Sequence, residues 1–176
     1  ADAARLAGAA VEKDERLLRG WVLRGLLRAG LGEREGALAD LTRAIKLDPD
    51  HVGALIERAA VLIELGHNDK ARADLDHVLA QREVAGAYLY RAVAVLKGRR
   101  RADAALADLE RAILLAPRLS DGYFHRAAVD LDAGEVDRAI ADLGLAEQLS
   151  PGGGRTWRPF EALLLRGHVH HARKEW

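Results

Sequence analysis

A period of 34 residues constrains the fold of this chain more than any other feature of its sequence. Three columns of identical residues recur at this step. They are Ala37, Ala71, Ala105 and Ala139; Asp40, Asp74, Asp108 and Asp142; and Leu41, Leu75, Leu109 and Leu143. A fixed period of this length is typical of helical repeat arrays, in which each repeat packs only on its neighbours.

Each period is expected to hold two helices. The first has a large residue four positions before a small one, at Trp21/Gly25, Leu55/Ala59, Tyr88/Ala92, Tyr123/Ala127 and Leu163/Gly167. The second carries the Ala and Leu columns and then Ala44, Val78, Ala112 or Ala146. Spacings of four and three place these residues on one helical stripe.

The helices are separated by residues that interrupt helical geometry. Glycines suited to a left-handed helix end stand between the two helices of each period, at Gly32, Gly66, Gly98 and Gly134. Prolines mark three of the breaks between periods, at Pro49, Pro117 and Pro151. The composition, rich in Ala, Arg, Leu, Gly and Asp, favours a GC-rich bacterial gene.

In order and spacing, Trp21, Gly25, Ala37, Leu41, Ala44 and Pro49 resemble the tetratricopeptide repeat (TPR) pattern. The resemblance implies an all-α fold, a right-handed superhelix (α-solenoid) of helix-turn-helix repeats. It predicts a flanking helix at 1–17, four repeats over 18–153 (18–51, 52–84, 85–119 and 120–153), and a loop with a capping helix at 154–176. The second repeat lacks the closing proline, and Arg28 and Asp130 fall near a usually aromatic column.

A column of arginines precedes the small residue of each first helix. Because an aspartate column faces it, we predict structural ion pairs: Arg24–Asp40, Arg58–Asp74, Arg91–Asp108 and Arg126–Asp142. The alternative is a stripe of arginines that anchors a ligand. Arg166 continues the column but has no matching aspartate.

The resemblance implies that the first helices line a concave face. The candidates for peptide binding there are Val22, Leu26, Ile56, Ile63, Leu89, Tyr90, Val93, Phe124 and Leu131; the same side also carries Leu23. An exposed apolar strip usually marks a binding site, so we expect an apolar or amphipathic segment to lie in this groove. Alternatively, these residues bury one another. The Lys, Asn and Arg clamp that holds chaperone tails is absent.

Composition excludes several classes of function. Lys plus Arg and Asp plus Glu number 27 each, so no net charge attracts nucleic acid. The chain lacks cysteine and a run of about 18 apolar residues, so we expect neither thiol chemistry nor membrane insertion. His125, His168 and His171 are too weak a pattern to predict a metal site. With no catalytic set, no enzyme activity and no cofactor are expected.

We therefore expect a protein–protein interaction scaffold or adaptor domain with a protein or peptide partner. The sequence leaves the compartment open, with the cytoplasm favoured slightly over the periplasm. The alternatives are a homo-oligomer that assembles through its groove or its open ends, and an accessory domain of a larger enzyme. Because residue 1 is not methionine, the chain is expected to be a piece of a longer protein.

Overall fold

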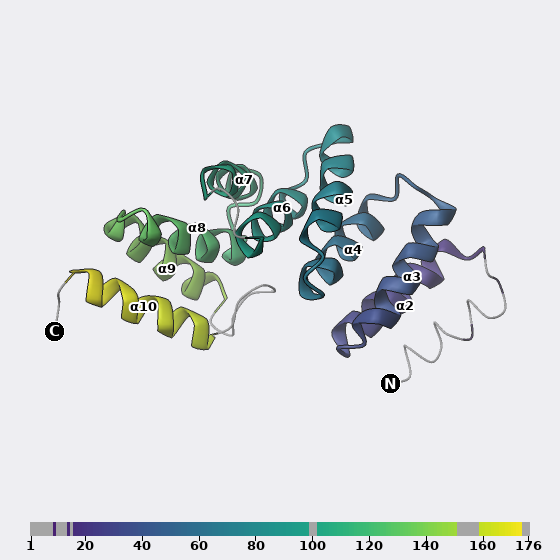
Figure 1. The fold of residues 1–176 in the computed structure, drawn as a ribbon, viewed down its shortest axis with the longest axis horizontal. Helices are drawn as coiled ribbons and strands as arrows, with labels where there is room; N and C mark the ends of the chain where they lie inside the picture. Colours follow the sequence, from purple (N-terminus) through teal and green to yellow (C-terminus); the bar gives the residue numbers. More distant parts are fainter. Residues whose placement is uncertain (1–8, 10–13, 15, 99–101, 151–158, 174–176) are drawn as a thin grey trace. The chain divides into compact units, whose positions relative to one another are not determined.

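The computed structural model describes residues 9, 14, 16–98, 102–150 and 159–173, which form helices joined by short turns (Figure 1). The predicted flanking helix at 1–17 and the loop before the last helix lie almost wholly outside the described residues. The chain divides into two compact units, Ala1–Glu83 and Val84–Trp176. Each unit is described by itself.

The N-terminal unit contains two helical hairpins. The first consists of α2 (Leu18–Gly30) and α3 (Arg34–Leu47), and the second of α4 (Val52–Glu64) and α5 (Asn68–Gln81). The two helices of each hairpin pack along each other, and α4 also contacts α3 and α2. Helices α2 and α4 begin at the first residues of the ranges predicted for the first two repeats.

The C-terminal unit continues the same pattern. Its hairpins are α6 (Ala85–Lys97) with α7 (Ala102–Leu115), and α8 (Ser120–Asp132) with α9 (Val136–Leu149). Helix α8 also packs on α7 and α6, and the last helix, α10 (Pro159–Arg173), packs on α9 and α8. The predicted all-α class of helix-turn-helix repeats is confirmed.

Three of the four glycines expected at helix ends adopt the left-handed conformation. The φ angles are 79° at Gly32, 79° at Gly66 and 84° at Gly134. In each turn the amide after the glycine donates to a carbonyl five residues earlier, as Glu33 N does to Arg28 O at 2.9 Å. This bond and its partner from the glycine amide satisfy two carbonyls at the helix end. Gly98 differs, because its φ is −75°.

A proline is not required to end the second helix of a repeat. Helix α3 ends before Asp48, which is extended (φ −142°, ψ 96°) and precedes Pro49. Helix α5 ends in the same way at Arg82 (φ −158°, ψ 153°), although no proline follows. The break between repeats is therefore kept in the repeat that departs from the proline pattern.

The core of each hairpin is made of the repeated columns. All four members of the Ala column and all four of the Leu column are buried. Gly25 shows why the first helix needs a small residue where it faces that core. A methyl group at Gly25 would lie 2.8 Å from Leu41 Cγ, closer than side-chain carbons approach, and Leu41 is fully buried.

Replacing Gly25 with alanine should therefore destabilise the chain, although alanine is the better helix former by about 1 kcal/mol. Overpacking of a filled core costs about 1–3 kcal/mol, so we expect a net loss of stability in urea unfolding. The matched control is Gly144→Ala in α9, where nothing lies within 4 Å of the added carbon. This control should gain about 0.5–1 kcal/mol. Equal shifts in the two variants would contradict the packing explanation.

Candidate interaction surface

Four arginines of the first helices each bind an aspartate of the second helix in the same repeat. In the first three pairs the guanidinium donates from Nε at 2.8 Å and from Nη2 at 2.7 Å. In the fourth the two distances are 2.6 and 2.8 Å. The pairs are Arg24–Asp40, Arg58–Asp74, Arg91–Asp108 and Arg126–Asp142. Two parallel charge-assisted bonds fix each pair in one geometry.

The surroundings of these pairs indicate a structural role. All four aspartates are buried, and three of the arginines also lie over the ring of the aromatic residue three positions earlier. The hydrogen bonds that Arg126 donates to Asp142 raise the pKa of Arg126. A guanidinium held between a ring and a buried carboxylate has little freedom left to bind a ligand.

The fifth arginine of the column has a different partner. Arg166 of α10 donates to Glu147 of α9, the second helix of the preceding repeat. This ion pair therefore joins α10 to the hairpin before it.

Arg28 and Asp130, which depart from the aromatic column, each lie beside a side chain of opposite charge. Arg28 donates a third hydrogen bond to Asp40, at 2.9 Å. Asp130 is buried, and its Oδ2 lies 3.1 Å from Arg138 Nε without hydrogen-bond geometry. Burial raises the pKa of Asp130. Arg138 also binds Glu110 of α7 at 2.7 Å.

The structure buries five of the nine residues predicted to line the peptide groove: Ile63, Leu89, Tyr90, Val93 and Phe124. In the C-terminal unit the cause is visible in the packing. Phe124 belongs to a buried cluster that includes Ala162 and Val169 of α10, and Leu131 packs against the same cluster. Neighbouring helices therefore cover part of the predicted strip, and its accessible part is smaller than the sequence predicts.

The accessible part lies mainly on α2. Val22 packs partly against the core, whereas Leu23 is 49% exposed and Leu26 is 37% exposed. On α4, the neighbouring first helix, Ile56 is partly exposed. Val22, Leu23 and Leu26 together are called the α2 patch below. They stand at i, i+1 and i+4 of one helix, which gives a short apolar strip.

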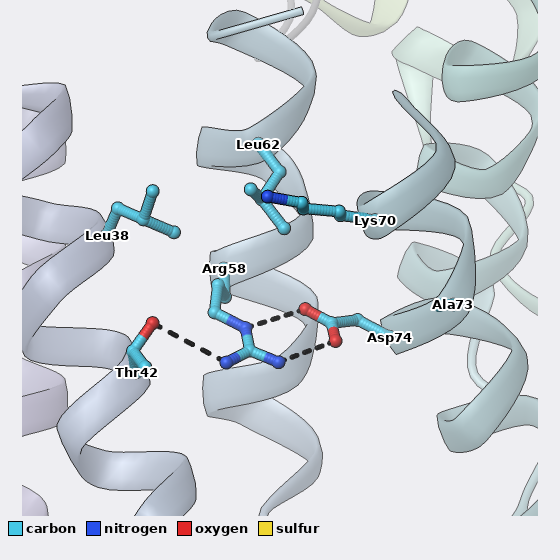
Figure 2. A pocket seen from close by; sticks show the side chains of 7 residues that line it. All are labelled: Leu38, Thr42, Arg58, Leu62, Lys70, Ala73 and Asp74. Atoms are coloured by element: carbon cyan, nitrogen blue, oxygen red, sulfur yellow. Dashed lines mark hydrogen bonds and ion pairs between the residues drawn. The ribbon is translucent and has the colours of Figure 1, made fainter. Parts of the chain in front are cut away.

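A second feature, a cleft, was not expected from the sequence. It has a volume of about 360 Å³ and lies among α3, α4 and α5 (Figure 2). Its lining residues are Leu38, Thr42, Arg58, Leu62, Lys70, Ala73 and Asp74. The cleft has an apolar wall, a hydroxyl group and three charged groups. The signal that could have found it is the difference between the repeats at positions 42, 62 and 70.

Among the described residues, no three His, Cys, Asp or Glu side chains lie close enough to hold a metal ion. His125 packs edge-on against Phe124, with ring centroids 5.3 Å apart. Burial lowers the pKa of His125 to about 4, so its ring is neutral at pH 7. Among the described helices, none combines the length and the apolar character needed to cross a membrane.

The low pKa of the partly buried His125 should make the stability of the protein depend on pH. The unfolded chain takes up a proton near the ordinary pKa of 6.5, whereas the folded chain does so only near pH 4. This contribution to stability is therefore complete above pH 6.5 and falls as the pH drops towards 4. In urea unfolding at pH 7 and pH 5, His125→Gln should lose less stability between the two pH values than the wild type. Equal losses of stability in the two proteins would contradict the low pKa of His125.

A double-mutant cycle measures the buried pairs. Arg126→Ala strands the carboxylate of Asp142, and breaking a buried pair costs about 3–5 kcal/mol. The double variant with Asp142→Ala should cost less than the sum of the single variants, with a coupling of at least about 1 kcal/mol. The matched control is the exposed pair Arg34–Glu64, at 2.7 Å, whose coupling should stay below about 1 kcal/mol. Equal couplings would contradict the role of burial.

Comparisons with known proteins agree with this geometry. Residues 28–96 match a family model described as tetratricopeptide repeat. A comparison with curated proteins gives no match.

Solved structures show the same fold. The type IV pilus biogenesis factor PilW superposes with a TM-score of 0.80 at 18% identity, over 96% of this chain and 76% of that one. A tetratricopeptide repeat protein from Parabacteroides merdae ATCC 43184 has a TM-score of 0.74 at 26% identity, over 99% and 66%. YrrB, described as a TPR protein with an unusual peptide-binding site, has a TM-score of 0.67 at 18% identity, over 98% and 95%.

The 34-residue columns, the helical hairpins built on them, the match over residues 28–96 and these shared folds agree: residues 28–96 form tetratricopeptide repeats, and the chain has the fold of tetratricopeptide repeat proteins.

Proposed function

We propose that this chain is a protein-interaction scaffold or adaptor that binds an apolar or amphipathic segment of a partner protein on its first helices. The α2 patch carries the proposal. Leu23 and Leu26 are substantially exposed, whereas the repeated Ala and Leu columns of the second helices are buried. Apolar side chains gathered on a surface mark an interaction site more often than scattered ones do.

The geometry of the patch fits a helical partner. Side chains at i and i+4 lie on the same side of a helix, so Val22 and Leu26 form a short ridge with Leu23 beside it. Helix α4 packs on α2 and adds the partly exposed Ile56 to this surface. An amphipathic helix places its anchors at the same spacings, which suits contact between two such ridges.

The contact residues proposed here are a revision of the sequence prediction. Val22, Leu26 and Ile56 are kept in the N-terminal unit and Leu23 is added, while the partly buried Leu131 is kept in the C-terminal unit. The five buried candidates hold the helices together and do not contact the partner. The fold of YrrB, described as a TPR protein with a peptide-binding site, supports the same class of ligand.

Self-association is a second candidate, and a different surface favours it. In the C-terminal unit, Leu163 and Leu164 of α10 are exposed. A second copy that covered α10 would bury these two leucines. Light scattering of the purified chain over a range of concentrations tests this. A mass that stays that of the monomer at every concentration would exclude it.

The partner hypothesis is tested by capturing partners on the immobilised chain and on its Leu26→Glu and Ile56→Glu variants. A carboxylate at a position that contacts an apolar partner should reduce capture about tenfold or more, because a charge would be desolvated in the complex. The matched control is Leu114→Glu, which adds the same charge at an exposed leucine of α7.

The variants must first show the helical content and unfolding midpoint of the parent. We expect the Leu26→Glu and Ile56→Glu variants to lose the same partner, and the Leu114→Glu variant to capture it as the parent does. Capture of every partner by all folded variants would refute the proposed surface.

A further inference from the structure

The cleft of the N-terminal unit combines an apolar wall with a lysine at its edge. Helix α4 packs between α3 and α5, and Leu38 from α3 and Leu62 from α4 point into the space between them (Figure 2). Lys70 of α5 also lines the cleft, and in this view its side chain extends in the direction of Leu62 (Figure 2). At about 360 Å³, the cleft is within the size range of sites for small ligands, roughly 300–1,000 Å³.

Two of the three charged groups in the cleft neutralise each other. Arg58 and Asp74 form one of the buried pairs, at 2.7 and 2.8 Å. Lys70 has no hydrogen-bond or ion-pair partner in the part of the chain that the structure describes. The cleft therefore presents one uncompensated positive charge beside its apolar wall.

Thr42 adds a hydrogen-bond donor. Its Oγ1 accepts from Arg58 Nη1 at 3.5 Å, which occupies one lone pair and leaves the hydroxyl proton free to donate. The cleft thus offers a ligand two donors, the ammonium of Lys70 and the hydroxyl of Thr42.

The equivalent positions of the C-terminal unit show which groups bind a cation at this place in the repeat. Two periods later, the matching positions hold Glu110 in place of Thr42, Asp130 in place of Leu62, and Arg138 in place of Lys70. There the cation is bound by carboxylates of the chain itself. Arg138 contacts Glu110 at 2.7 Å and Asp130 at 3.1 Å. The same position in the N-terminal unit keeps the cation but lacks both carboxylates.

We propose that the cleft among α3, α4 and α5 is a binding site for an aliphatic monocarboxylate, which supplies the carboxylate that the chain provides for itself in the C-terminal unit. The ligand carboxylate accepts from the ammonium of Lys70 and the hydroxyl of Thr42. Its aliphatic body lies against Leu38 and Leu62. This site is separate from the α2 patch, so either proposal can fail without the other.

The probe is sodium hexanoate, titrated into the purified chain and followed by amide chemical shifts. Shifts should concentrate on α3, α4 and α5. Acetate has the carboxylate without the aliphatic chain, so it loses the apolar contact. Hexanamide has the aliphatic chain without the carboxylate, so it loses the charge-assisted bond. Both should bind at least about tenfold more weakly than hexanoate. Equal binding of hexanamide, or shifts spread over other helices, would overturn the proposal.

Two variants test the named groups. Lys70→Met removes the exposed cation, and it should weaken hexanoate binding about tenfold or more. Thr42→Glu combined with Lys70→Arg installs the Arg–Glu pair of the C-terminal unit in the cleft, so hexanoate binding should be lost. The matched control is Lys97→Met, which removes an exposed lysine of the other unit and should leave binding unchanged.

The variants must keep the unfolding midpoint of the parent within the error of the measurement. If the folded Lys70→Met and Thr42→Glu/Lys70→Arg variants bind hexanoate as tightly as the parent does, the site is refuted. A drop shared equally by Lys97→Met would show a general charge effect and would also refute it.

The carboxylate could come from a free acid or from the last residue of a peptide. N-acetyl-Ala-Leu with a free carboxylate, compared with its amide, distinguishes these sources. Tighter binding of the peptide acid than of hexanoate assigns the site to peptide ends, and the reverse order assigns it to free acids. In either case the Lys70→Met variant should bind the ligand more weakly than the parent does. If neither ligand binds, the proposal is overturned.

Discussion

In each complete hairpin, an arginine of the first helix donates two hydrogen bonds to a buried aspartate of the second helix, and this pair holds the two helices together. The pair forms only because the backbones approach closely, and the small residue beside each arginine allows that approach. At Gly25 the space left for a side chain is already filled by Leu41. The packing and the ion pair therefore depend on each other. Because a buried charge without its partner is costly, each pair also fixes the register of one helix along the other.

Much of this architecture is predictable from the sequence because it repeats. The period predicts helix-turn-helix repeats, and the structure contains such hairpins. The facing Arg and Asp columns indicate which side chains meet. Accessibility was harder to predict. Helical periodicity shows that Leu89 and Tyr90 lie away from the packing stripe, but it does not show which neighbouring helix covers them. The conformation of Gly98 was missed for a similar reason, because a glycine permits a left-handed turn without requiring one.

The cleft lay beyond the sequence argument because it arises from differences between repeats. Shared columns reveal the fold, whereas Thr42, Leu62 and Lys70 are informative only beside Glu110, Asp130 and Arg138. Even with that comparison, the ion pairs of the C-terminal unit are needed to see that the same space is occupied there by carboxylates. Variation at equivalent positions thus distinguishes a closed site from an open one within a single chain.

Each of the four Arg–Asp pairs closes within its own hairpin, between residues 16 or 17 positions apart. Charge compensation is therefore modular. A duplication or deletion of one whole period would add or remove one of these arginines together with its aspartate, and it would leave no member of the four pairs without its partner. An array built in this way can gain or lose repeats during evolution, and the remaining arginines and aspartates of these pairs need no new partners.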